Sequence, residues 1–271
     1  MKLKNIYGVF LMALMLIVAS CDPIEDRDIL SNSFDPDDID LQVVQSTDGG
    51  NKLSIQMNTE GVTGYWDYII DKKYTDRVEV IFPFTGTHTF TYHVTTPYLL
   101  DGNPGNTEFA EKEVSVEITQ LDEPLPDAYY SLIGENLEGK TWVFDGGPEP
   151  DGRKWWYMAA PYNWEELWWN AGGDCCPPAD AAGKMVFDLN GGANYTYYSS
   201  PDAAGVEASF VFNADYTTIT FDGASILGYD EARVNPSSTY EIKELTSDKM
   251  ILYTATNGGG TGWVWVFVPA E

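Results

Sequence analysis

The stretch Thr89-Phe90-Thr91-Tyr92-His93-Val94 places an apolar or aromatic side chain at every second position. Successive side chains of a β-strand point to opposite faces, so this alternation predicts a strand with one buried face. His88 and His93 are five positions apart in the same run and therefore face opposite sides of the sheet. We expect both histidines to have structural roles.

Four further runs between residues 39 and 120 have the same character, and Asp-Gly-Gly and Thr-Gly turns separate them. These runs are Leu41–Val44, Leu53–Met57, Val78–Phe82 and Val114–Ile118. Short alternating strands broken by turns are typical of a sandwich. We therefore predict an immunoglobulin-like β-sandwich for residues 39–120.

The rest of the chain, residues 137–271, contains nine further candidate strands. They are Thr141–Phe144, Lys154–Met158, Met185–Leu189, Tyr195–Tyr198, Ser209–Phe212, Thr217–Phe221, Tyr240–Leu245, Met250–Tyr253 and Trp263–Val268. Aromatic residues make up 14% of the chain, and no long stretch has a clear helical period, so we predict an all-β protein. Nine short strands favour a second β-sandwich or jelly roll, with a closed meander barrel as the alternative. The Pro- and acid-rich joint Asp122–Asp127 predicts a linker over residues 121–136.

The chain begins with Met1-Lys2-Leu3-Lys4, continues with an apolar run to Ala19, and reaches Cys21 through small residues. This pattern predicts a signal peptide over residues 1–20, because the run is short for a bilayer-spanning helix. Val18-Ala19-Ser20-Cys21 also resembles the bacterial lipobox, which implies acylation of Cys21 and a lipid anchor. An ordinary signal peptide followed by an incidental cysteine is the alternative.

Residues 21–38 are polar and acidic, which predicts a flexible tether between the membrane and the folded part. Acidic residues directly after the cysteine resemble the surface-export signal of lipoproteins in the Bacteroidota, and this implies the outer membrane and the cell surface. In other Gram-negative groups, Asp22 at this position resembles an inner-membrane retention mark instead.

The formal net charge of −27 excludes a nucleic-acid-binding protein, since such proteins need a basic surface. The same charge disfavours sulfated or uronate-rich glycans. Besides Cys21, the chain has only Cys175 and Cys176, which are either two thiols in a loop or a vicinal disulfide. We expect no metal site there and no cofactor. A structural calcium ion is only weakly indicated, because the acidic run Asp35–Asp40 lacks the glycine and the final glutamate of an EF-hand.

Seven large aromatic residues lie between positions 155 and 169. We predict a strand at Trp155 and Trp156, and then a loop with one helical turn that places Trp164 and Trp168 on the same side. Exposed aromatic rings on a loop suit a sugar, whose C–H face lies flat on an indole. The candidate carbohydrate-binding residues are Trp155, Trp156, Tyr157, Tyr162, Asn163, Trp164, Glu165, Trp168 and Trp169. The alternative is a lid whose tryptophans fill the core.

Two parts of the chain resemble known families. Gly86–Thr96, Glu111–Thr119 and Tyr65-Trp66-Asp67-Tyr68 resemble a polycystic-kidney-disease-like (PKD-like) domain, which implies a spacer. The usual Gly-Asp-Gly after the tryptophan is replaced by Ile69-Ile70-Asp71-Lys72.

Lys140–Asp145, Met185–Leu189 and Tyr240–Thr246, together with the tryptophan-rich segment, resemble the C-terminal module of Bacteroidota surface glycan-binding lipoproteins. This resemblance implies capture of a polysaccharide, such as a β-glucan, for an outer-membrane glycan importer, and the net charge indicates that the polysaccharide is neutral. The segment Gly173–Pro178 departs from that pattern. The start Leu137–Trp142 also resembles lipocalin-like domains, which implies a carrier of small apolar ligands as an alternative.

Catalysis is not expected. Glu165 and Glu166 are adjacent, so they cannot lie on both sides of a glycosidic bond as the two-carboxylate mechanism requires. The sequence also lacks a Gly-x-Ser-x-Gly elbow and a zinc-binding helix motif. We therefore expect a binding protein, and the remaining alternative is a surface protein whose aromatic segment contacts another protein.

Overall fold

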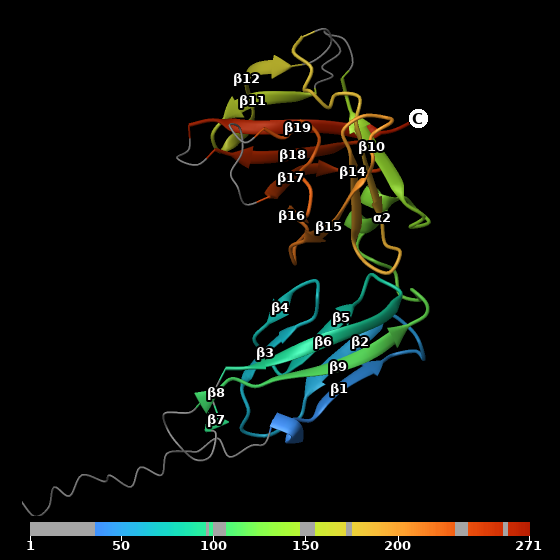
Figure 1. Cartoon of the computed structure of the whole chain (residues 1–271), viewed down its shortest axis with the longest axis vertical. Coiled ribbons are helices and arrows are strands. Elements are labelled where there is room, and N and C mark those ends of the chain that lie inside the picture. Colours follow the sequence, from blue (N-terminus) through green and yellow to red (C-terminus); the bar gives the residue numbers. More distant parts are fainter. Residues whose placement is uncertain are drawn as a thin grey trace, which may run out of the picture.

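The computed structural model describes residues 36–95, 98–99, 107–146, 155–171, 175–230, 238–256 and 260–271. The predicted signal peptide, Cys21 and most of the predicted tether lie outside these residues. The described part is almost entirely β-structure, as predicted, with one short α-helix and the 3-10 turn η1 (Pro36–Asp38). Figure 1 shows an N-terminal group of small sheets below a larger C-terminal barrel.

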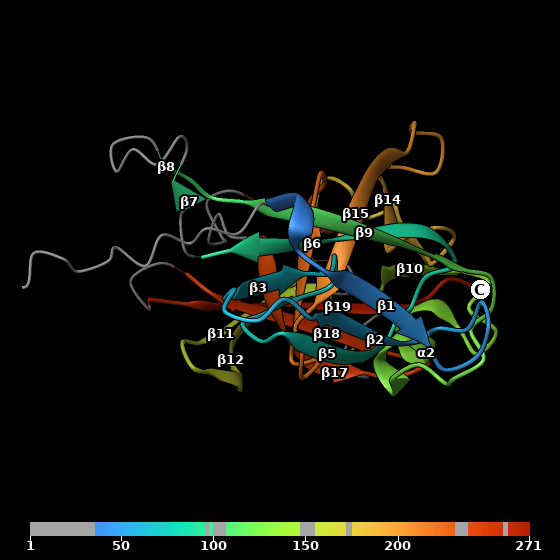
Figure 2. The same ribbon diagram turned by 90° about the horizontal axis from the view of Figure 1, so that it is seen from below.

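The N-terminal part contains two main antiparallel sheets, visible in front of the barrel in Figure 2. One sheet has the order β1 (Leu41–Gln45), β2 (Lys52–Met57), β5 (Arg77–Ile81). The other has the order β4 (Lys72–Lys73), β3 (Gly64–Asp67), β6 (Gly86–Val94), β9 (Glu111–Ile118), and β7 (Tyr98–Leu99) pairs with β8 (Thr107–Glu108). All five predicted strands form. Alternate residues of both sheets, such as Ile55, Trp66 and Phe90, are fully buried in one core.

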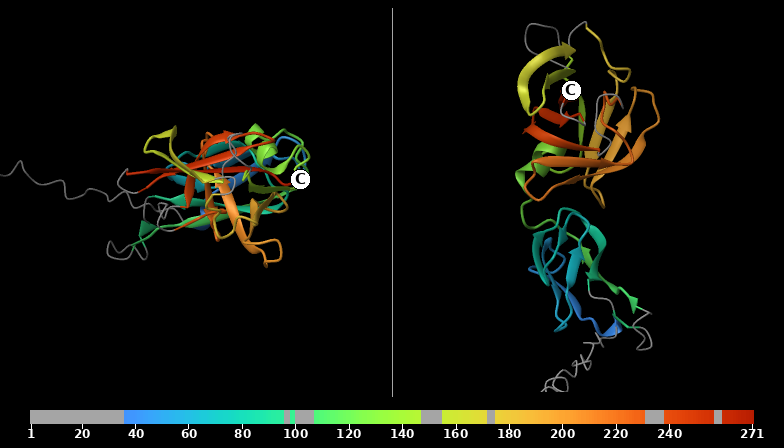
Figure 3. Two further views of the ribbon diagram at one scale, coloured as in Figure 1. Left: turned by 90° about the horizontal axis from the view of Figure 1, so that it is seen from above. Right: turned by 90° about the vertical axis from the view of Figure 1, so that its left-hand side faces the viewer.

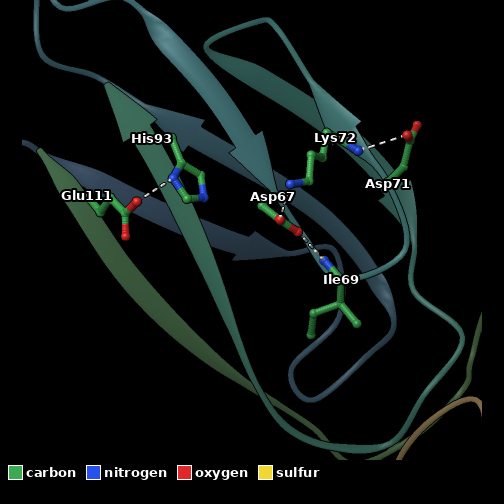
Figure 4. Close-up of polar contacts among 6 residues, drawn as sticks. All are labelled: Asp67, Ile69, Asp71, Lys72, His93 and Glu111. Carbon is green, nitrogen blue, oxygen red and sulfur yellow. Dashed lines mark hydrogen bonds and ion pairs between the residues drawn. The ribbon is translucent and has the colours of Figure 1, made fainter. Parts of the chain in front are cut away.

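The two histidines lie on opposite faces of β6. His88 is 7% exposed and packs against Phe82 and Phe84. On the other face, the His93 ring stacks on Tyr65, and its Nδ1 atom lies 3.0 Å from the Glu111 carboxylate (Figure 4). The predicted placement is therefore confirmed.

The turn between β3 and β4 contains the departure from the PKD-like pattern. Its backbone is held by Asp67, which accepts a hydrogen bond from the Ile69 amide (3.3 Å), and by Asp71, which accepts one from the Lys72 amide (2.8 Å; Figure 4). Ile69 has a φ of +76°, which is costly for a β-branched residue. Ile69 and Ile70 line a cleft together with Ser209, Phe210 and Val211 of the C-terminal part, so this turn lies between the two parts of the molecule.

The C-terminal part is a closed antiparallel barrel of eight strands. In order they are β10 (Lys140–Phe144), β13 (Lys184–Asp188), β14 (Asn194–Tyr198), β15 (Val206–Phe212), β16 (Thr218–Asp222), β17 (Thr239–Leu245), β18 (Met250–Ala255) and β19 (Gly262–Pro269). β19 returns to pair with β10 from Trp142↔Pro269 to Phe144↔Phe267. The predicted sandwich or jelly roll is therefore wrong for this part, and the meander barrel, our alternative, is correct. Consecutive strands pair with their neighbours, and the pairing of β10 with β19 closes the barrel along the second half of β19.

Aromatic rings fill the barrel interior. Phe187 contacts Tyr195, Phe210 and Phe221, and the chain of ring contacts continues through Tyr240 to Trp265. Trp142, Phe187, Tyr195, Trp265 and Phe267 have relative exposures of 0%. These rings make up the core of the barrel.

Helix α2 (Asp127–Ile133) closes the barrel end that faces the N-terminal sheets. Leu132 and Ile133 are fully buried, the Leu132 carbonyl accepts a hydrogen bond from the Trp142 indole (2.8 Å), and Tyr129 packs edge-on against Phe212. We expected only a linker here. The segment is instead part of the barrel core.

In the described part of the chain, no helix is long and apolar enough to cross a bilayer.

Candidate functional site

The tryptophan-rich segment forms a β-hairpin of β11 (Trp156–Ala160) and β12 (Asn163–Ala171). β11 pairs with the first half of β19, from Trp156↔Trp265 to Ala159↔Gly262, while the second half of β19 pairs with β10. The hairpin thus continues the barrel wall beyond the end of β10. Figure 1 and Figure 3 show it at the end of the molecule farthest from the N-terminal sheets.

The predicted loop with a helical turn is wrong, because residues 163–171 form the strand β12. The first half of β19 extends past β10 and leaves an edge that β11 occupies, and β11 in turn offers its other edge to β12. Ladder hydrogen bonds satisfy the backbone of this segment more fully than one helical turn would.

One face of the hairpin joins the barrel core. Trp156 is 5% exposed, and its ring lies 4.9 Å from Trp169 and 5.3 Å from Trp263 between centroids. Trp155, just before the strand, is half-buried and packs directly over Gly146. Trp156 is therefore a core residue, and its ring packs against the ring of Trp169.

The other face covers a second, smaller core. Tyr157 and Ala159 are buried there together with Tyr253 and Val264, and Trp164 packs against them. Burial, reinforced by the negative charge of Glu165, raises the pKa of Tyr157 to about 12. At neutral pH this phenol is thus protonated and belongs to the core.

The outer strand presents the exposed aromatic residues. Relative exposures are 85% for Tyr162, 49% for Trp168 and 38% for Trp169, and Leu167 adds a further 46%. Pairing shifts from Met158↔Trp169 to Ala159↔Leu167, so Trp168 is an extra residue at a bulge. Bulges re-aim side chains at strand edges, and this one leaves the Trp168 ring at the surface.

Polar groups surround these rings. Asn163, Glu165 and Glu166 are exposed, and Glu166 accepts a hydrogen bond from the Trp168 indole (3.2 Å). The Tyr162 amide donates to the Tyr253 hydroxyl (2.9 Å), which holds the hairpin turn against the second core. Five of the nine predicted residues are therefore exposed on the hairpin, namely Tyr162, Asn163, Glu165, Trp168 and Trp169, and Trp164 is half-buried against the second core.

The other three predicted residues, Trp155, Trp156 and Tyr157, lie in or against the packed interior. Sequence reasoning also missed Leu167, whose exposed apolar side chain stands next to Trp168. In the sequence, only the position of Leu167 within an unbroken run of large side chains indicated that it belongs to this surface.

The structure joins Cys175 and Cys176 in a vicinal disulfide. Among the described residues, no group of three or more His, Cys, Asp or Glu side chains is arranged to hold a metal ion. Neither a scan against protein-family models nor a search of curated proteins found a match for this chain.

Proposed function

We propose that this chain is a lipid-anchored protein of the outer-membrane surface that binds a neutral polysaccharide through the hairpin β11–β12 and holds it for a glycan importer. The observation that carries the proposal is the exposure of Tyr162, Trp168 and Trp169 on one hairpin, which also carries exposed carboxylate and amide groups. Indole faces attract the C–H face of a pyranose, and the neighbouring polar groups accept hydrogen bonds from its hydroxyls.

Two further observations agree with this proposal. The net charge of −27 repels anionic polymers, which favours a neutral glycan. The hairpin lies at the end of the molecule opposite the N-terminal sheets, so a tether anchored at Cys21 would direct it outward. In this proposal, the N-terminal part is a PKD-like spacer that carries the binding domain away from the membrane.

A protein partner is the second candidate, because β12 is the last strand in the sheet order and has β11 as its neighbour. Strand edges accept extended peptides. The bulge at Trp168 interrupts the regular edge, however, and bulges discourage strand addition.

The test is binding of the full chain, purified in detergent, to a panel of neutral and acidic polysaccharides. We expect a neutral glycan to bind, and Trp168→Ala and Trp169→Ala each to weaken binding about tenfold or more, as aromatic hot spots do. The matched control is Tyr74→Ala, since Tyr74 is 78% exposed but lies in the N-terminal part. Binding of no polysaccharide, with the fold intact, would refute the proposal and direct attention to a protein partner.

A further inference from the structure

Besides the hairpin, the barrel has a cleft at the end opposite α2. Its volume is about 480 Å³, within the usual range for small-ligand sites. It is lined by the segment that follows the vicinal disulfide, by the end of β14 and by the loop after β16. The residues that matter for its chemistry are Pro177, Asp180, Tyr197, Gly228, Tyr229 and Asp230.

Asp180 is the fixed polar group of this cleft. Both of its carboxylate oxygens lie 3.0 Å from the Gly228 amide, and one accepts a hydrogen bond from the Tyr197 hydroxyl (2.8 Å). A carboxylate has about four acceptor positions, so Asp180 retains capacity to accept hydrogen bonds from a ligand. Burial, together with the bond to Asp180, raises the pKa of Tyr197, which therefore stays protonated and keeps the carboxylate oriented.

The backbone around Asp180 is equally constrained. The Gly183 amide donates to the Asp180 carbonyl (2.8 Å), and the Ala181 amide donates to the Pro178 carbonyl (3.1 Å). Gly228 has a φ of +73°, and a Cβ atom there would lie 2.8 Å from the Phe144 ring. The cleft floor is thus built on the packed end of the barrel.

Tyr229 supplies an aromatic surface, because it lines the cleft and remains 36% exposed. The combination of an exposed ring, a fixed carboxylate and a second acidic side chain, Asp230, suits a polyhydroxylated ring. It does not suit an anion. It also lacks the three or more clustered ligands that a metal ion would need within the described residues.

A short series of contacts connects the cleft to the hairpin. The Gly228 carbonyl accepts a hydrogen bond from the Trp265 indole (3.2 Å), Trp265 is the register partner of Trp156, and Trp156 packs against Trp169. Both surfaces therefore belong to the same end of the barrel.

We propose that the Asp180–Tyr229 cleft binds a second sugar unit of the neutral glycan that the hairpin β11–β12 holds. This inference rests on the proposed function. Hydroxyls of the sugar donate to Asp180, and Tyr229 packs against its C–H face. Two subsites on one polymer raise the affinity, since binding at the first increases the effective concentration at the second.

The experiment compares variants of the full chain in detergent, by calorimetric titration with the polysaccharide that binds best in the panel described above. We expect Tyr229→Ala to weaken binding about tenfold, Tyr229→Phe to retain it because the ring remains, and Asp180→Asn to weaken it. Tyr74→Ala is again the matched control. Thermal unfolding of each variant shows whether the fold persists; if Asp180→Asn unfolds, the two Tyr229 variants decide.

The two proposals fail in different ways. If Trp168→Ala weakens binding but Tyr229→Ala leaves it unchanged, the cleft is not a subsite and the hairpin proposal stands. If the unsubstituted chain binds no polysaccharide, both proposals fall together.

Discussion

The barrel interior and the hairpin β11–β12 are built from the same residue types but place them differently. Trp265 in the barrel is fully buried, whereas Trp168 in β12 is 49% exposed. β19, which carries Trp265, is paired along both of its edges, while β12 pairs with β11 on one side and is interrupted by a bulge. Strand pairing, more than residue type, therefore decides which of these tryptophans is buried in the fold and which is exposed at the surface.

The largest expected effect comes from substituting a buried tryptophan of the barrel interior. Trp265→Ala removes a ring that contacts Tyr240 and donates to Gly228, so we expect the free energy of unfolding to fall by about 3–5 kcal/mol. Trp168→Ala should change it by less than about 0.5 kcal/mol. Denaturant unfolding measures both, and similar losses for the two variants would contradict the distinction.

Two glycines, Gly228 and Gly191, test how tightly the barrel end near Gly228 is packed. Gly228 and Gly191 have nearly equal φ angles, +73° and +74°, but a Cβ atom would meet Phe144 at Gly228 and nothing within 4 Å at Gly191. We expect Gly191→Ala to cost about 1 kcal/mol from backbone strain, and Gly228→Ala to cost about 2–3 kcal/mol, since packing strain is added. Equal costs, measured by thermal unfolding, would show that the barrel end is loosely packed.

The titration of Tyr157 tests whether this hairpin residue is buried in the second core. Its pKa is raised from 10.0 to about 12, so between these values the unfolded chain releases a proton that the folded chain retains. Stability is then full below about pH 10 and is lost as pH rises toward about 12, by at most about 1.4 kcal/mol per pH unit for this group. Denaturant unfolding across this range should show a shallower decline for Tyr157→Phe than for the unsubstituted chain.

The smallest expected effect is a change in fluorescence quenching. Acrylamide quenches exposed indoles, so Trp168→Phe combined with Trp169→Phe should remove most of the quenchable tryptophan fluorescence. Trp142→Phe, at a fully buried position, should leave the quenchable fraction as it is. Loss of that fraction in the Trp142 variant would mean that the barrel interior is accessible to solvent.

Local patterns in the sequence predicted the strands well. Each of the nine runs proposed for the C-terminal part overlaps a strand, because alternation reports directly on one buried face. The run Lys154–Met158 does so only from Trp156 onward, and Lys154 lies outside the described residues. Barrel closure was not predictable in this way. It depends on the pairing of Trp142–Phe144 with Phe267–Pro269, two segments far apart in the chain whose local patterns also fit a sandwich.

The sequence indicated the candidate site as a segment but did not indicate which of its residues are exposed. β12 has no regular alternation, and its outer residues from Glu165 to Trp169 are all exposed, so the strand period was hidden. Trp156 and Trp168 look equivalent in the sequence, and only the bulge and the pairing to β19 separate them. Helix α2, with seven residues, is too short to show a helical period.

The pairing of β19 with both β10 and β11 affects how much conformational entropy the hairpin would lose on binding a ligand. β19 belongs to the closed barrel and also pairs with β11, so the hairpin cannot move relative to the barrel without breaking the hydrogen bonds between β11 and β19. Its backbone is already ordered before any ligand arrives. Association would then give up mainly the rotamer freedom of side chains such as Trp168, about 0.5–1.5 kcal/mol each, rather than the entropy of a folding loop.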